Sequence, residues 1–196
     1  MDKNGAALSA LENRFVLFSC EGTAEGVIIQ TLYDNDLLVV PRERVVKDAV
    51  MVSRPYTRVR SASKIADQYF PMNYVGEGAE GLTVARIVDS RSSKFEFPKR
   101  KQNGTQVLSF ITRPEIEMLT IHREGAYSAW QRQSRKNRQL RPPDFCIQEL
   151  RLGDIKEKDF LDRYWSDPAA LVDSIRKHAE KAKRGSGELL LVDLLK

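Results

Sequence analysis

The most constraining feature of this chain is an apolar run that stops abruptly at a carboxylate and a glycine. The stretch reads RFVLFSCEGTAEGVIIQ over residues 14–30. The near-continuous apolar character of residues 14–20 predicts a buried strand of a parallel sheet, because such strands are covered on both faces. Residues 24–33 then carry apolar side chains at helical spacing and predict a helix. The chain is therefore expected to form an α/β fold whose first strand ends in Glu21-Gly22.

The same alternation of strand and helix patterns continues along the chain. Residues 37–40 predict a second strand, which would complete a compact βαβ unit. Later strands are predicted at 83–88, running directly into Asp89, and at 107–111. Helices are predicted at 61–70, capped by Ser61 or Ser63, and after 107–111, with Thr112 as the N-cap and Pro114 in the first turn. A further helix is predicted from Asp167-Pro168 to about Lys183. We expect an open, mostly parallel sheet with helices on both faces and a helical C-terminal extension. The predicted division is an α/β core over 1–122 and a basic, mainly helical region over 123–196 that packs on the core.

Composition narrows the classes of protein that fit. The chain has 196 residues, of which 41% are hydrophobic and 30% are charged, which is ordinary for a globular protein. No apolar run approaches the roughly 18 residues of a membrane span, so no membrane partner is expected. The N-terminus lacks the basic-then-apolar order of a secretory signal, so we expect a cytoplasmic protein. Two histidines and two cysteines do not favour a zinc site, and Cys20 and Cys146 are expected to be buried free thiols.

Positive charge is unevenly distributed. The net charge is +5, and the stretch 123–141 contains six basic residues opposed only by Glu124. Such clustering favours a polyanionic partner, DNA or RNA. Two aromatic residues of this stretch, Tyr127 and Trp130, either stack a base or pack on neighbouring elements. The residues predicted to contact phosphate are Arg91, Arg132, Arg135, Lys136 and Arg138.

Four carboxylates follow the predicted strand ends. Glu21 and Asp89 come directly after strands, Glu117 lies just beyond a third, and Glu25 stands one helical turn after Glu21. Because the carboxyl ends of parallel strands meet at one edge of a sheet, we expect these four acids to converge. Oxygen-only ligands favour Mg²⁺ or Mn²⁺, which polarise a phosphodiester and generate a hydroxide nucleophile. The pattern predicts a metal-dependent nuclease.

Each acid also has a structural interpretation. Glu21 and Glu115 are suited to complement a helix dipole, and Asp89 is suited to a turn or cap. Glu25 is compatible with a solvated position on the surface. The nuclease hypothesis therefore depends on the convergence of the acids rather than on any one of them.

The order of these motifs resembles the TOPRIM fold, the metal-binding module of topoisomerases, primases and several nucleases. FVLFSCEGTAEGVII is similar to the family's strand ending in Glu-Gly, and the spacing from Glu21 to Glu25 resembles the two-acid pattern of overcoming-lysogenization-defect nucleases. VARIVDSRS occupies the place of the Asp-x-Asp strand, with Asp89 as its first acid. The resemblance implies that Glu21, Glu25, Asp89 and Glu117 hold Mg²⁺ or Mn²⁺ and act in catalysis.

More narrowly, TRPEIEMLTIHREGAY resembles the Pro-x-Phe-Glu-leucine-rich helix of RloB-like proteins, in which the Glu corresponds to Glu117. This resemblance implies a role in bacterial anti-phage defence or abortive infection, with an ATPase as a possible partner and a homo-oligomer as a possible state. The chain departs from the TOPRIM pattern at Arg91, where a second acid is expected. Either the four acids suffice, or the site is degenerate and the protein is a sensor or adaptor that binds an ATPase or nucleic acid. A plain nucleic-acid-binding domain is a third, weaker interpretation.

Overall fold

The computed structural model describes residues 3–76, 78–89, 95–101 and 104–196. Within these residues, five strands form one all-parallel sheet in the order β2-β1-β5-β6-β7. The strands are β1 (Phe15–Cys20), β2 (Tyr56–Thr57), β5 (Leu82–Val88), β6 (Gln106–Ile111) and β7 (Leu189–Leu190), and a separate antiparallel pair joins β3 (Val75–Gly76) to β4 (Ala79–Glu80). The predicted α/β class with a mostly parallel sheet is confirmed.

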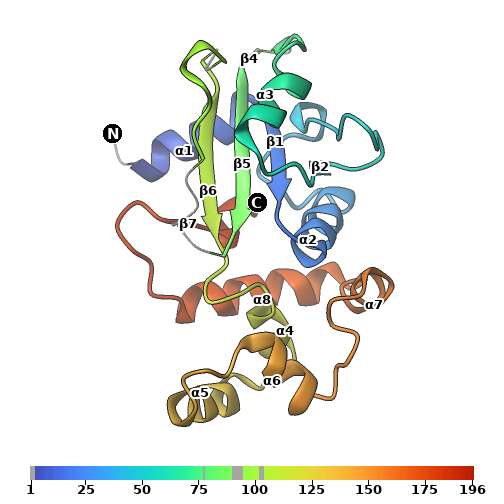
Figure 1. Cartoon of the computed structure of the whole chain (residues 1–196), viewed down its shortest axis with the longest axis vertical. Coiled ribbons are helices and arrows are strands. Elements are labelled where there is room, and N and C mark those ends of the chain that lie inside the picture. The colour runs from blue at the N-terminus through green and yellow to red at the C-terminus, as the bar shows by residue number, and fades with distance from the viewer. Residues whose placement is uncertain (1–2, 77, 90–94, 102–103) are drawn as a thin grey trace.

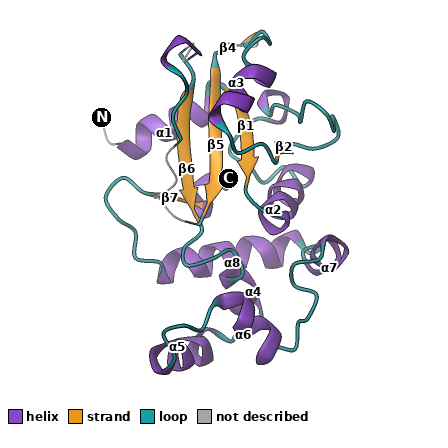
Figure 2. Cartoon of the chain, in the orientation of Figure 1, coloured by secondary structure: helices purple, strands orange, loops and turns teal. Residues whose placement is uncertain are grey.

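Helices surround this sheet and continue beyond the carboxyl ends of its strands. Their bounds are α1 (Lys3–Glu12), α2 (Thr23–Asp34), α3 (Ala62–Tyr69), α4 (Met118–Arg123), α5 (Tyr127–Lys136), α6 (Pro142–Gln148), α7 (Lys158–Tyr164) and α8 (Pro168–Lys181), with 3₁₀ turns η1 (Arg42–Arg44), η2 (Lys99–Lys101) and η3 (Leu191–Leu194). In Figure 1 the arrowheads of β1, β5 and β6 point toward α8, and α4, α5 and α6 lie beyond it. Figure 2 shows that this lower part of the molecule is helical. The C-terminal helices therefore lie at the carboxyl edge of the sheet.

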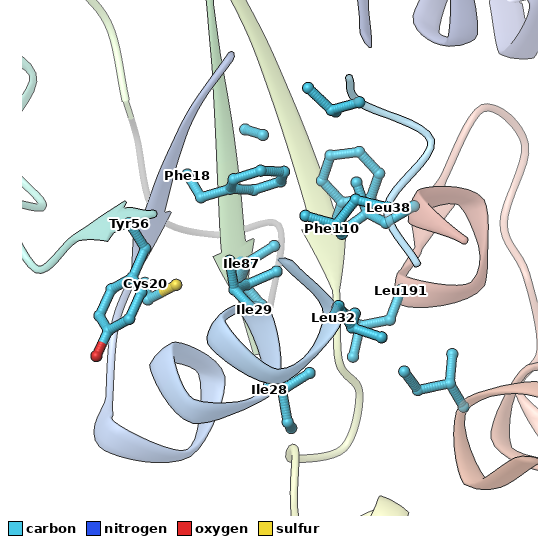
Figure 3. Packing of buried hydrophobic residues seen from close by; sticks show 14 of the residues in the cluster. Phe18, Cys20, Ile28, Ile29, Leu32, Leu38, Tyr56, Ile87, Phe110 and Leu191 are labelled. Atoms are coloured by element: carbon cyan, nitrogen blue, oxygen red, sulfur yellow. The ribbon is translucent and has the colours of Figure 1, made fainter. Parts of the chain in front are cut away.

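The two faces of the sheet are covered by different helices. Along β1, Phe18 and Cys20 point toward α2 and pack with Ile28, whereas Leu17 points the opposite way and packs with Ile65 of α3. This follows from the strand period of two, which sends successive side chains to opposite faces. Figure 3 shows the larger cluster, in which Phe18 is fully buried. Each such side chain contributes roughly 1.5–3 kcal/mol through burial.

The predicted strand over 37–40 is wrong. Leu38 forms only an isolated antiparallel bridge with Leu195, and the backbone N–H of Val39 donates to the carbonyl of Leu194 at 2.8 Å. The second strand of the first crossover is instead β2, which pairs in parallel with β1. Residues 37–40 are apolar because they pack in the main hydrophobic core, where Leu38 is 2% exposed.

The helix predicted from Thr112 begins later than expected. The peptide bond between Arg113 and Pro114 is cis, and α4 begins at Met118 with Glu117 as its N-cap. In contrast, α8 begins as predicted, because the side chain of Asp167 accepts hydrogen bonds from the first-turn N–H groups.

The division of the chain into 1–122 and 123–196 stays a prediction. The C-terminal region contributes β7, which pairs with β6 and so belongs to the same sheet as the N-terminal strands.

Among the helices described, none combines the length and the apolar character that a membrane span requires. Cys20 and Cys146 are buried free thiols, as expected.

Candidate functional site

The strand order of the sheet reverses between β1 and β5. The chain passes from β1 to β2 on one side and returns past β1 to β5 on the other, so the order reverses between these two neighbours. The two strands also end level, because Cys20 is paired with Ile87 in the parallel register. In open α/β sheets ligands bind at this switch point, outside the carboxyl ends of the strands. Glu21 and Asp89 follow directly from these two ends.

Gly22 and Glu25 shape the start of α2. Gly22 is the N-cap residue, and Glu25 lies in the first turn. A Cβ added to Gly22 would lie 2.6 Å from Oε2 of Glu25. The Glu25 carboxylate therefore folds back over the N-terminus of the helix, close to the Cα of Gly22.

Glu25 is the most perturbed carboxyl group at this edge. Its side chain is buried with 5% of its surface exposed, so its interpretation as a solvated surface residue is wrong. Burial raises the pKa of Glu25 to about 7, and the charges of Asp89 and Glu117 act in the same direction. The backbone N–H groups of Glu25 and Gly22 partly oppose this rise in pKa. The Glu25 carboxyl group therefore exchanges its proton near neutral pH.

Asp89 is held in place from the neighbouring strand. The hydroxyl of Thr112 donates to Oδ1 of Asp89 at 3.0 Å, and the Thr112 N–H donates to the carbonyl of Val88 at the same distance. Thr112 is 2% exposed, so this contact is shielded from water. The residue predicted to cap a helix instead fixes the orientation of a candidate metal ligand.

Glu117 comes to the same edge from α4. Burial raises its pKa, Glu115 and Asp89 raise it further, and Lys156 lowers it. Glu25, Asp89 and Glu117 are thus electrostatically coupled, although they come from three separate segments. Three of the four acids predicted from the sequence form one interacting set.

Glu21 is coupled to a different partner. Burial lowers the pKa of Arg86, and the negative charge of Glu21 acts in the opposite direction. The two side chains are therefore close enough to interact electrostatically. The alternation along β1 places Glu21 on the face of Leu17, and Arg86 of β5 lies on that same face. The sequence interpretation did not single out Arg86, although an arginine inside the apolar stretch 83–88 signals a buried charge that needs a partner.

The coupled carboxylates suit magnesium in their chemistry. Among the described residues, no group of three or more His, Cys, Asp or Glu side chains is close enough together to hold a metal ion. Mg²⁺ does not require such a group, because it usually keeps several waters and binds one or two carboxylates together with substrate phosphate. A cation here would also offset the repulsion that raises the pKa of Glu25. The residues present therefore fit a hydrated Mg²⁺ or Mn²⁺ ion.

The predicted phosphate-binding residues lie farther from the sheet. Arg132, Arg135 and Lys136 belong to α5 and Arg138 follows it, and all four side chains are exposed. In Figure 1, α8 and α4 lie between the sheet and α5. Arg91 lies outside the described residues. Trp130 of the same helix is 8% exposed and meets Phe145 edge-on at 5.5 Å between ring centroids, so it packs in the helical region.

No family model, curated protein or solved structure matches this chain. The resemblance of its acidic motifs to TOPRIM and RloB-like proteins stays a prediction.

Proposed function

We propose that this protein is a nuclease that uses Mg²⁺ or Mn²⁺ to hydrolyse phosphodiester bonds of DNA or RNA. The observation that supports the proposal is the electrostatic coupling of Glu25, Asp89 and Glu117 beside the switch point of the sheet. The resemblance to TOPRIM and RloB-like proteins directs the proposal toward bacterial anti-phage defence.

In this proposal each residue has a separate role. Asp89, oriented by Thr112, and Glu117 would hold the ion. When bound, the ion supplies charge neutralisation at the phosphate and a more acidic water. Glu25, whose pKa is near 7, accepts a proton from the attacking water, because a general base works best when its pKa is close to the operating pH. Exposed arginine and lysine side chains of α5 bind the nucleic-acid backbone.

The test measures cleavage and metal binding on the same variants. Labelled single- and double-stranded DNA and RNA are incubated with the protein, with and without Mn²⁺, and thermal unfolding is followed over a Mn²⁺ titration. Ligand binding at 100 times Kd adds about 2.7 kcal/mol of stability, so a bound ion raises Tm. Asp89→Asn and Glu117→Gln are expected to abolish cleavage and the Tm shift together.

Glu180→Gln is the matched control, because Glu180 is an exposed carboxylate of α8. It should retain both cleavage and the shift. If the parent protein shows neither a Mn²⁺-dependent Tm shift nor cleavage of any substrate, the nuclease proposal is wrong.

The coupling of Glu21 to Arg86 favours a second candidate function. The first acid of the TOPRIM-like motif is adjacent to an arginine charge, so it is less available to a cation. A degenerate TOPRIM-like subunit would bind an ATPase or nucleic acid as a sensor or adaptor without cleaving it. Nucleic-acid binding that persists in EDTA and in Asp89→Asn, with no cleavage in the parent protein, would support this function over the nuclease.

A further inference from the structure

A second concave site lies among the C-terminal helices. A cavity of about 340 Å³ opens between α4, α5, α8 and β7. Its volume falls at the lower end of the range for small-molecule sites, about 300–1,000 Å³. Glu25, Asp89 and Glu117 are not among the residues that line it. The cavity is therefore distinct from the carboxylate site.

One wall of the cavity is aromatic. Tyr127 and Trp130 of α5 both line it. Tyr127 is stacked nearly parallel to His122, with ring centroids 4.7 Å apart and an interplanar angle of 16°. Trp130 is fixed by its edge-on contact with Phe145. Both rings are held by neighbouring rings before any ligand arrives, which favours the binding of a flat, apolar group.

The rim of the cavity carries positive charge. Arg113, Lys181 and Lys183 line the cavity, and no carboxylate does so among the described residues. Glu188 pairs with Arg113 and offsets one of the three charges. The remaining excess of positive charge suits an anionic group such as phosphate.

His178 supplies a polar group that the protein itself leaves unsatisfied. It lines the cavity from α8, is only 9% exposed, and neither ring nitrogen has a hydrogen-bond partner among the described residues. Burial lowers the pKa of His178, so the neutral ring offers one donor and one acceptor. The backbone carbonyl of Arg113 is near enough to favour protonation but lies outside hydrogen-bond geometry. A half-turn of the ring exchanges its nitrogens with ring carbons and can present a nitrogen to the cavity.

We propose that this cavity binds a base joined to a phosphate, as in a nucleoside monophosphate or the end of a nucleic-acid strand. The base packs against Tyr127 and Trp130, the phosphate pairs with Lys181 and Lys183, and His178 hydrogen-bonds to a polar edge of the ligand. Three independent features, an aromatic wall, a cationic rim and a buried unpartnered imidazole, meet in one cavity. The proposal goes beyond the nuclease proposal and does not require a metal ion.

Isothermal titration calorimetry in EDTA tests this site. The probes are AMP, CMP, inorganic phosphate, and a trinucleotide with and without a 5′-phosphate. We expect at least one base-bearing phosphate to bind at least tenfold more tightly than inorganic phosphate. Binding of the mononucleotides indicates a free-nucleotide site, whereas binding of the 5′-phosphorylated trinucleotide alone indicates a strand-end site, and both results support the proposal.

Variants separate the two halves of the site. The double substitution Lys181→Ala and Lys183→Ala should weaken nucleotide binding at least tenfold, and Tyr127→Ala should weaken nucleotide binding but not phosphate binding. Lys177→Ala is the control, because Lys177 belongs to the same helix but pairs with Asp173 at 2.6 Å and does not line the cavity.

The proposal is overturned if no probe binds, if phosphate binds as tightly as the nucleotides, or if the cavity variants bind like Lys177→Ala. Thermal melts confirm that each variant is folded. Asp89→Asn should leave nucleotide binding in EDTA unchanged even when it abolishes cleavage, so failure here is distinguishable from failure of the nuclease proposal.

Discussion

Replacing Glu25 with glutamine should stabilise the protein at alkaline pH. Glu25 is 5% exposed, and its pKa is raised from 4.5 to about 7 by burial, with Asp89 and Glu117 adding to the effect. A carboxyl group with a raised folded-state pKa binds its proton more tightly in the folded protein than in the unfolded chain. The free energy of unfolding therefore falls as the pH rises from about 4.5 to about 7.

The magnitude follows from the difference in pKa. One unit corresponds to about 1.4 kcal/mol, so a rise from 4.5 to about 7 costs the ionised protein about 3 kcal/mol. Glutamine keeps the shape of the side chain without its charge. Glu25→Gln should match the parent protein at pH 4.5 and exceed its stability by up to about 3 kcal/mol at pH 8. For a domain of this size, that gain corresponds to a rise in Tm of roughly 6–12 °C.

Urea unfolding from pH 4.5 to pH 8.5, in EDTA, measures this effect. The slope of free energy against urea concentration should stay constant, so that the midpoints report stability alone. Glu180→Gln, which removes an exposed carboxylate of α8, is the matched control and should follow the pH dependence of the parent protein. The reasoning is refuted if Glu25→Gln is no more stable than the parent protein at pH 8, or if the two pH profiles run parallel.

Three further variants test the fold and the basic surface. Gly26→Ala should destabilise the protein by about 1–3 kcal/mol although alanine favours helices, because the new Cβ would lie 2.6 Å from the Tyr56 ring. An equal loss of stability in a Tyr56→Leu background would contradict this explanation. Asp167→Ala should cost about 1 kcal/mol in denaturant unfolding because it removes the N-cap of α8, and an unchanged stability would argue against a capping role. The double substitution Arg135→Ala and Lys136→Ala should lower affinity for duplex DNA and reduce the slope of log K against log salt by about 2, and an unaltered slope would show that α5 does not contact phosphate.

Local patterns predicted the elements that carry a strong period or a capping signal. The apolar run after Arg14 became β1, which spans Phe15–Cys20, and the helical spacing that follows became α2, which spans Thr23–Asp34. Ser61, one of the two serines that the sequence offered as a cap, caps α3 through its side chain. These elements were predictable because burial and capping act over only a few neighbouring residues.

Other assignments failed because they depended on distant parts of the chain. Residues 37–40 have the composition of a strand, yet they pair with the C-terminal residues near Leu195 instead of joining the sheet. The real partner of β1 is the two-residue strand at Tyr56–Thr57, which has too few residues to show a period. A short apolar run indicates that a segment is buried, but it does not indicate which other segment packs against it.

The sequence by itself determined that carboxylates follow the strand ends, that a glycine separates two of them, and that the chain is an α/β protein. Only the tertiary structure decided which acids interact: it couples Glu25 to Asp89 and Glu117 while it leaves Glu21 beside Arg86. It also assembled the cavity around His178 from segments far apart in the chain. The physical reason is that helix and strand periods arise from local geometry, whereas the field at a buried group depends on every charge that folding brings near it.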